Sequence, residues 1–133
     1  MKRVLEPELM DDPEQAQAYA QKDFSEENQY FINEFCRQFP EFLAGHVVDL
    51  GCGPADIPIQ LVRALPACTV VGIDASPPMI RLGEKAVTAA RLRDHVRLRC
   101  EPIQMARLPE PADAIISNSL LHHLPNPMDF WIA

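Results

Sequence analysis

Residues 47–56 read Val-Val-Asp-Leu-Gly-Cys-Gly-Pro-Ala-Asp, an apolar run that ends in an acid and then in two glycines one residue apart. A β-branched run that stops at glycine is typical of a buried strand followed by a tight turn. Glycines in such a turn leave the main chain bare, so a ligand can approach it closely. The pair alone is a weak signal, because any tight strand-to-helix turn also favours glycine.

The composition limits the classes of function. The chain has 133 residues, 47% hydrophobic and 23% charged, as expected for one soluble globular domain. Its net charge of -7 argues against a nucleic-acid partner, which requires clustered basic residues. No apolar run approaches the ~20 residues of a membrane span, so we expect no membrane partner. The N-terminus lacks an apolar signal region, which indicates a cytoplasmic protein.

The cysteines indicate neither a metal site nor a disulfide framework. No Cys-x-x-Cys pair and no zinc-like spacing occurs, and we assign no metal ligands. Widely spaced cysteines of this kind are typical of buried thiols in a reducing compartment. The four positions are Cys36, Cys52, Cys68 and Cys100.

Two helices are predicted before residue 45, and strands alternate with helices after it. The first helix begins at Asp12-Pro13-Glu14 and runs to about residue 22, and the second runs from Ser25 to Pro40. Strands are expected over 46–50, 68–73, 95–100 and 114–117, and helices over 57–65, from Ser76 onward and over 125–133. This alternation predicts βαβ units and a parallel sheet. We therefore treat 1–133 as one domain, with a leading helical segment at 1–44 and a core at 45–133.

Polar residues and glycines follow all four predicted strands. In a parallel α/β sheet, ligands bind outside the carboxyl ends of the strands, so these residues can converge on one crevice. Asp74 closes the second strand and suits the two hydroxyls of a ribose, although an ordinary loop with a helix cap is the alternative. Asn118 has a similar alternative, since asparagine often satisfies its own turn. The full set is Asp49, Gly51, Gly53, Asp74, Glu101 to Gln104, Ser117 and Asn118.

A dinucleotide site is less favoured. Its Gly-x-Gly-x-x-Gly pattern would place the third glycine at position 56, where this chain has an aspartate. A carboxylate beside a pyrophosphate is repelled, and Asp49 adds a second negative charge. The loop suits a ligand with a ribose and a positive group, so an NAD(P)-dependent oxidoreductase remains only the lesser alternative.

Three segments together resemble the class I S-adenosylmethionine-dependent methyltransferases: VVDLGCGPAD (47–56), VVGIDASPPMI (70–80) and DAIISNSLLHHLPNP (113–127). The resemblance implies a Rossmann-like three-layer α/β sandwich with parallel strand order 3-2-1-4 and S-adenosyl-L-methionine as cofactor. It also implies a set of cofactor-binding residues. These are Asp49 for the ammonium, Gly51 and Gly53 for close backbone approach, Asp74 for the ribose, Ala75 and Met79 near the adenine, and Asn118 on the methionine side.

The sequence departs from the family pattern in two places. Many members have an acid after the third strand that bonds the adenine amino group, but here the segment is Cys-Glu-Pro-Ile-Gln at 100–104. We place Ile103 and Gln104 near the adenine, and both Glu101 and Gln104 stay open as substitutes for the acid. Ala55 replaces a third loop glycine, which we treat as a mild change.

The resemblance implies methyl transfer to an unidentified acceptor, which we expect to be a small molecule. No catalytic residue is assigned. The pair His122–His123 lies in an apolar context that favours a structural role over general-base catalysis. The alternative function is a non-catalytic or fragmentary module that only binds the cofactor.

The last segment suggests that the core is incomplete. Residues 129–133 have no glycine or basic stop signal, so we expect the chain to be an N-terminal portion of a longer enzyme, truncated before the later strands. An apolar strand over 114–117 would then form an exposed sheet edge through which two copies could pair as a homodimer.

Overall fold

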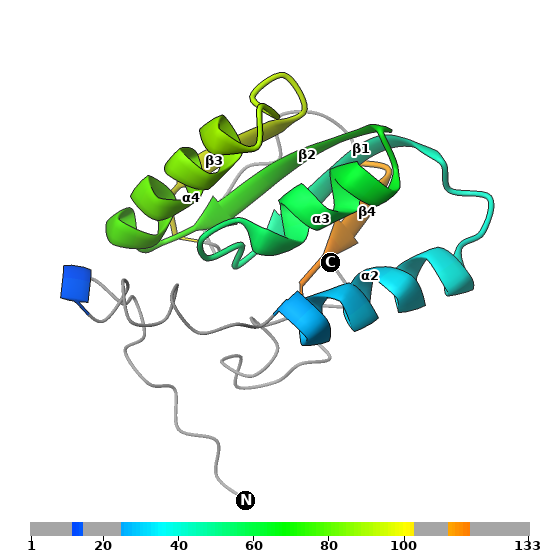
Figure 1. Cartoon of the computed structure of the whole chain (residues 1–133), viewed down its shortest axis with the longest axis horizontal. Coiled ribbons are helices and arrows are strands. Elements are labelled where there is room, and N and C mark those ends of the chain that lie inside the picture. The colour runs from blue at the N-terminus through cyan, green and yellow to red at the C-terminus, as the bar shows by residue number, and fades with distance from the viewer. Residues whose placement is uncertain (1–11, 15–24, 103–111, 118–133) are drawn as a thin grey trace, which may run out of the picture.

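The computed structural model describes residues 12–14, 25–102 and 112–117 (Figure 1). Within these ranges the chain forms an alternating α/β fold. The element order is α2 (Ser25–Gln38), β1 (Ala44–Leu50), α3 (Asp56–Ala64), β2 (Ala67–Asp74), α4 (Pro77–Ala89), β3 (Val96–Cys100) and β4 (Ala114–Ile116). Every predicted strand and every predicted helix that falls inside the described ranges is present, with ends that differ by one or two residues.

The four strands form one parallel sheet in the order β3-β2-β1-β4. Val47 of β1 pairs with Val70 of β2 on one side and with Ala114 of β4 on the other. The strand order expected from the resemblance is therefore confirmed. The central strands β1 and β2 are the most buried ones, because their neighbours on both sides exclude water.

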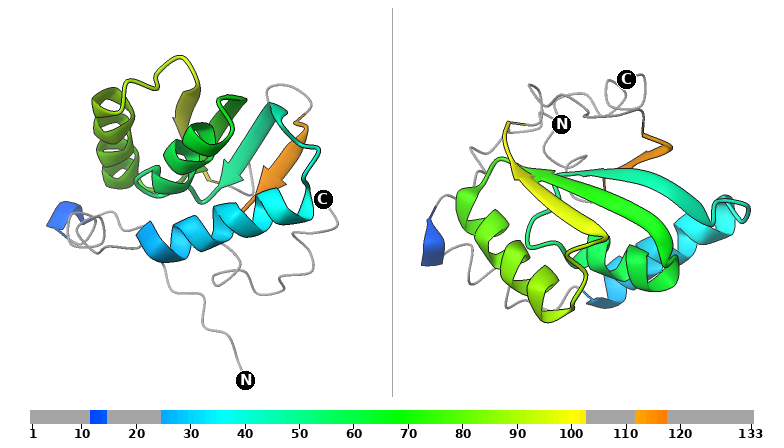
Figure 2. Two further views of the ribbon diagram at one scale, coloured as in Figure 1. Left: turned by 45° about the vertical axis from the view of Figure 1, so that its right-hand side comes forward. Right: turned by 90° about the horizontal axis from the view of Figure 1, so that it is seen from above.

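The helices α2, α3 and α4 lie on one face of the sheet (Figures 1 and 2). Their apolar side chains form the main core with alternate residues of the strands. This core includes Ile32, Ile57, Leu61, Val87, Val47, Val70, Val96 and Ile116. The opposite face carries a second buried cluster of Val48, Val71 and Ile73. The third layer of the expected sandwich falls outside the described residues.

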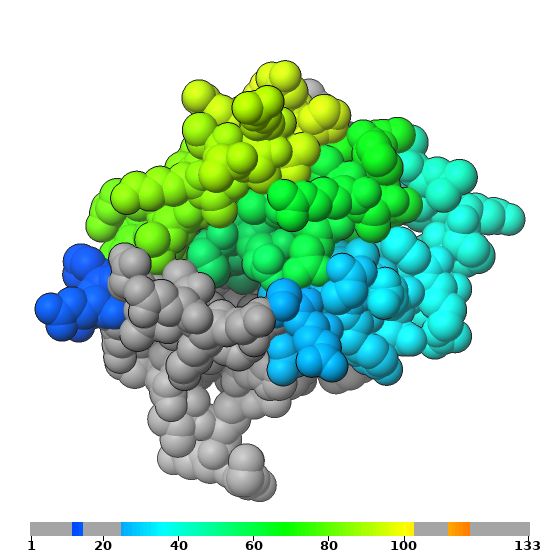
Figure 3. All heavy atoms as spheres, viewed as in Figure 1, coloured from blue at the N-terminus to red at the C-terminus, as the bar shows by residue number. Residues whose placement is uncertain are grey.

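Helix α2 lies beside α3, as the space-filling view also shows (Figure 3). The side-chain amide of Asn28 donates to a carboxylate oxygen of Asp56 at 2.5 Å, which joins the N-terminal turns of the two helices. The aromatic end of α2 continues into the turn that follows it. There the Phe35 ring centroid lies 5.4 Å from that of Phe39 and 5.6 Å from that of Phe42.

The first predicted helix lies mostly outside the described residues. Residues 13 and 14 are helical, and the Glu14 amide donates to Asp12 Oδ1 at 3.0 Å, as expected for the acid cap. The predicted helix at 125–133 also lies outside. All four cysteines are free thiols.

Gly72 lets the loop after β1 pack directly on β2. A β-carbon at this position would lie 2.9 Å from both Cβ and Sγ of Cys52 and 2.9 Å from Leu98 Cδ2. At Gly83 of α4 the contact is less restrictive, because a β-carbon would lie 2.7 Å from Leu98 Cδ1, the flexible end of that side chain, and 3.3 Å from Ala55 Cβ. The glycine loop is therefore held against the sheet mainly by the close contact at Gly72, which a larger residue would prevent.

We predict that Gly72→Ala lowers the free energy of unfolding by about 1–3 kcal/mol, the usual range for overpacking a core. The added methyl meets Cys52 Cβ, which cannot move without its backbone. Gly83→Ala is the matched control, because its closest contact is the flexible tip of Leu98 and alanine favours the helix. Urea denaturation of both variants checks this, and an equal loss at the two positions would contradict it.

Candidate functional site

The carboxyl ends of β1 and β2 lie side by side and carry the glycine loop. Asp49 pairs with Gly72, and Leu50 pairs with Ile73. Beyond the strands, the amides of Gly51 and Cys52 both donate to the carbonyl oxygen of Ile73, at 2.7 and 3.1 Å. The first turn of the loop is therefore fixed to the end of β2, at the edge where parallel α/β sheets bind ligands.

Three residues of the loop have left-handed backbone conformations. The φ angles are 78° at Gly51, 55° at Gly53 and 73° at Ala55. Glycine adopts this conformation without strain, whereas alanine does so at a cost of about 1–2 kcal/mol. The replacement of a third glycine by Ala55 is thus a strained change rather than a mild one. The Ala55 side chain is fully buried beside Gly83, which offsets part of the strain.

Gly53 faces open space. Within the described part of the chain, no atom lies within 4 Å of the place where its β-carbon would stand. The protein's own packing therefore does not require glycine here, although the left-handed φ favours it. The bare main chain at this position is available to a ligand.

The Asp74 carboxylate links the two loops. Its Oδ2 accepts from the Gly53 amide at 2.9 Å, and its Oδ1 accepts from the Ser76 amide at 2.9 Å. A carboxylate oxygen can accept more than one hydrogen bond, so both keep capacity for a ligand hydroxyl. Ser76 also caps α4, because its Oγ accepts from the Met79 amide at 3.3 Å. The sequence predicts a helix that begins at Ser76, but it gives no signal for the hydrogen bond from the Ser76 amide to Asp74.

Asp49 is a buried acid, with a relative exposure of 2%. Burial raises the pKa of its carboxyl well above the ordinary value, and the negative charge of Asp74 raises it further. A cationic ligand group near Asp49 would favour its ionised form. Burial also raises the pKa of the neighbouring Cys52 thiol, which agrees with a packing role for this cysteine rather than a nucleophilic one.

Some of the remaining predicted residues lie inside the described ranges and others lie outside them. Ala75 is half-buried and Met79 is buried, both next to Ser76 at the start of α4. Ile103, Gln104, Asn118, His122 and His123 lie outside the described residues, so their predicted roles stay predictions. Glu101 donates its amide to the Asp74 carbonyl at 3.0 Å, and its carboxylate pairs with Arg99 at 2.8 Å.

Asp56 occupies the position where a dinucleotide motif would have its third glycine, and it begins α3. Its carboxylate accepts from Asn28 and from Gln60, at 2.5 and 2.8 Å, at the junction of α2 and α3. Both donors are neutral amides, and our expectation that this loop does not suit a pyrophosphate stays a prediction.

A further buried polar atom lies at the end of β4. Ser117 is 3% exposed, and its Oγ is buried without a hydrogen-bond partner among the described residues. The adjacent residue Ile116 pairs with Asp49, so Ser117 follows the strand next to the acid. Across the described ranges, no group of three or more acidic, cysteine or histidine side chains is placed to hold a metal ion. Nor is any helix there long and apolar enough to cross a membrane.

The strand order, the glycine loop after β1 and the acid at the end of β2 define a Rossmann-like domain that binds a nucleoside-containing cofactor. Residues 47–130 match the methyltransferase domain family, and the chain belongs to this family.

Curated relatives include trans-aconitate 2-methyltransferases. The enzyme of Klebsiella pneumoniae (strain 342) is 37% identical over 79 residues, which cover 59% of this chain and 29% of the relative. The enzyme of Azoarcus sp. (strain BH72) is 29% identical over 103 residues, which cover 77% and 38%. The chain thus spans well under half the length of these relatives.

Solved structures of methyltransferases have the same fold as this chain. An S-adenosyl-L-methionine-dependent methyltransferase of Methanococcus maripaludis, described as putative, superposes with a TM-score of 0.67 at 22% identity, covering 81% of this chain and 50% of that one. Coclaurine N-methyltransferase, bound to N-methylheliamine and SAH, gives 0.60 at 19% identity, covering 68% and 26%. At these identities the likeness establishes the shared fold.

We predict that Asp74→Asn lowers the free energy of unfolding by about 1.5–3 kcal/mol, the usual range for losing a hydrogen bond to a charged group. One carboxylate oxygen becomes an amide NH₂ that faces an N–H donor, either at Gly53 or at Ser76. Asp94→Asn is the control, because Asp94 is exposed, and we expect a change within about 0.5 kcal/mol. Chemical denaturation measures both. Equal stability of Asp74→Asn and the unmodified protein would show that the hydrogen bonds of Asp74 contribute little to the free energy of unfolding.

We predict that Asp49→Asn stabilises the ligand-free protein at neutral pH by about 1–2 kcal/mol, as function-related residues often limit stability. The raised pKa of Asp49 means that folding favours its protonated form. The contribution of protonated Asp49 to the stability of the fold is therefore complete below the pKa of this acid in the unfolded state. It is lost as the pH rises through the pKa of Asp49 in the folded state. The melting temperatures of the two proteins should nearly coincide at acidic pH and diverge toward neutral pH. A difference that does not change with pH would contradict this.

Proposed function

We propose that this chain binds S-adenosyl-L-methionine at the carboxyl ends of β1 and β2 and forms the cofactor-binding part of a methyltransferase. The observation that carries the proposal is the hydrogen bond from the Gly53 amide to Asp74, because it holds a carboxylate that suits ribose hydroxyls directly beside an open stretch of main chain. The family assignment and the relatives' names support the same activity.

The residues present fit this cofactor. The buried Asp49 suits the ammonium of the methionine moiety, and the bare backbone at Gly51 and Gly53 suits the close approach of that moiety. Asp74 keeps acceptor capacity for the ribose hydroxyls. The unpartnered hydroxyl oxygen of Ser117 gives a further polar contact at the end of β4.

When bound, S-adenosyl-L-methionine supplies a methyl group already activated by its sulfonium, so transfer chiefly requires alignment of the acceptor. Alignment alone can contribute about 7–11 kcal/mol of a barrier. In this chain the fixed loop and the Asp74 link position the cofactor. No general base is assigned to the described residues, and none is needed unless the acceptor must lose a proton.

The acceptor that we propose is a small molecule. Trans-aconitate is the first to test, because the relatives named above act on it according to their names. A demethylmenaquinone methyltransferase of Lactiplantibacillus plantarum, 44% identical over 55 residues, gives a second acceptor class. The net charge of -7 supports the exclusion of nucleic acid. We also propose a cytoplasmic location, which the free thiols support.

We predict that S-adenosylhomocysteine binds the unmodified chain and that Gly53→Ala weakens this binding at least tenfold. The added methyl would occupy the open space that the ligand needs, while the fold loses only about 1–2 kcal/mol for the left-handed alanine. Isothermal titration calorimetry measures the affinity, and thermal unfolding confirms that the variant is folded. NAD and NADP serve as control ligands.

The results separate the possible functions. Binding of NAD or NADP in preference to S-adenosylhomocysteine would overturn the proposal in favour of an oxidoreductase domain. Unchanged affinity in Gly53→Ala would place the cofactor elsewhere. Cofactor binding without turnover of any acceptor would favour the alternative of a non-catalytic module.

A further inference from the structure

The glycine loop is attached to the rest of the domain at several points along its length. At its start, two backbone amides donate to a carbonyl oxygen of β2, and in its middle the Gly53 amide donates to Asp74. At its end the chain passes through Ala55 into α3, whose first residue is Asp56. The first attachments are all made to β2, so the end of the loop depends on contacts of a different kind.

Ala55 has a backbone conformation that its side chain disfavours. Its φ angle of 73° lies in the left-handed region, where glycine is relaxed and alanine is strained. Its amide donates to the Cys52 carbonyl at 3.1 Å, and its carbonyl accepts from the Ile59 amide at 3.1 Å. A strained residue keeps such a conformation only where the structure around it holds the chain on both sides.

The carboxylate of Asp56 accepts hydrogen bonds from two helices at one oxygen. Its Oδ2 accepts from Asn28 Nδ2 of α2 at 2.5 Å and from Gln60 Nε2 of α3 at 2.8 Å. Hydrogen bonds to a charged oxygen are about twice as strong as those between neutral groups. The residue that follows the strained alanine is therefore fixed by a helix that lies 28 positions earlier in the sequence.

The hydrogen bond from Gln60 to Asp56 is made at a cost. Gln60 Oε1 is buried and has no hydrogen-bond partner among the described residues. A buried acceptor without a partner is unfavourable, and such exceptions need a specific reason. The reverse orientation of this side-chain amide would place its oxygen against the carboxylate, whereas the observed one directs the NH₂ group to it. The hydrogen bond to Asp56 therefore outweighs the unpaired oxygen of Gln60.

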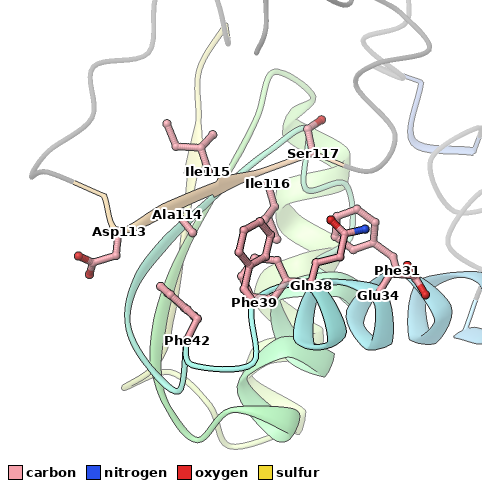
Figure 4. Close-up of a pocket in the computed structure, with 11 residues that line it drawn as sticks. Phe31, Glu34, Gln38, Phe39, Phe42, Asp113, Ala114, Ile115, Ile116 and Ser117 are labelled. Atoms are coloured by element: carbon pink, nitrogen blue, oxygen red, sulfur yellow. The ribbon is translucent and has the colours of Figure 1, made fainter. Parts of the chain in front are cut away.

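Helix α2 can hold the end of the loop because the helix is itself anchored in the core. Ile32, one turn after Asn28, is 1% exposed and belongs to the main core. The rest of the helix runs along β4, and Phe31, Gln38 and Ile116 line the pocket between the two elements (Figure 4). The N-terminal turn of α2 thus provides a fixed hydrogen-bond donor beside the loop.

We propose that Asp56 is a positioning residue for the cofactor: Asn28 and Gln60 hold its carboxylate, and the held residue keeps Ala55 and the end of the glycine loop in the conformation that receives the ligand. Asp56 acts through the main chain of the loop and not by contact with the cofactor. The link to the cofactor rests on the proposed function, whereas the effect of α2 on the loop depends on no ligand. Helix α2, which precedes the sheet in the chain, thereby contributes to the geometry of the site.

Amide hydrogen exchange of the ligand-free 133-residue chain, followed by NMR, tests the effect of α2 on the loop. In Asn28→Ala the Ala55 amide should exchange about tenfold faster, as the loss of a hydrogen bond to a charged group predicts. The Val70 amide donates to the His95 carbonyl at 2.8 Å within the sheet, and its exchange reports opening of the whole domain. It should change much less than the Ala55 amide.

Two further variants show whether the hydrogen bond itself is responsible. Gln29→Ala is the matched control, because Gln29 also donates from its side-chain amide, but to Asn33 of the same helix at 2.9 Å. Exchange of the Ala55 amide should then stay within about twofold of the unmodified chain. Asp56→Asn keeps one oxygen that can accept from both donors, so it should resemble the unmodified chain, while Asp56→Ala should resemble Asn28→Ala.

Isothermal titration calorimetry with S-adenosylhomocysteine tests the link to the cofactor. Asn28→Ala should weaken the affinity by about threefold to tenfold, and Gln29→Ala should leave it within about twofold. In an Ala55→Gly background the left-handed conformation is relaxed, so the addition of Asn28→Ala should change the affinity by less than about twofold. A purely structural role of Asn28 would lower the melting temperature without this dependence on residue 55.

Three results would overturn the proposal. Equal exchange of the Ala55 amide in Asn28→Ala and in the unmodified chain would show that α2 does not hold the loop. Equal acceleration at Val70 would indicate a loss of stability of the whole domain. Faster exchange at Ala55 with unchanged affinity would show that the end of the loop does not position the ligand. If the unmodified chain does not bind S-adenosylhomocysteine, the proposed function fails, and the exchange rates still decide whether Asp56 holds the loop.

Discussion

The site depends on the hydrogen bonds that the carboxylate of Asp74 accepts. It accepts one hydrogen bond from the loop after β1 and one from the start of α4, so two segments that follow different strands are held by a single side chain. Both donors are backbone amides, whose positions are fixed by the adjacent sheet and helix. A carboxylate that is already oriented loses little entropy when a ligand arrives, which favours binding.

Close packing supplies the second constraint. The glycine loop lies between β2 and α4 because Gly72 and Gly83 have no side chains to separate these layers. In the same loop Ala55 has a left-handed conformation, and its methyl group is completely buried. The loop is strained and tight contacts surround it, so the core stabilises a loop conformation that the loop alone would not adopt.

The buried Asp49 shows how binding and stability oppose each other in this domain. Burial and the nearby charge of Asp74 both disfavour its ionised form, so in the absence of a cation the acid is unfavourable where it stands. A cationic ligand group reverses this balance. In the function that we propose, the residue whose ionisation costs stability in the free protein is also the one that favours a positively charged ligand.

The sequence by itself determined the alternating α/β pattern, the parallel sheet, the polar residues that end each strand and, through the resemblance, the strand order. These follow from local rules: β-branched runs, helix caps at Ser76, and glycines where the chain turns. Only the tertiary structure decided which partners those residues meet. The sequence placed an aspartate at position 56, and only the structure shows that Asn28, distant in sequence, donates to it at the α2–α3 junction. The hydrogen bond between Gly53 and Asp74 likewise depends on segments far apart in the chain, whose approach is set by packing of the sheet and helices and not by any local pattern.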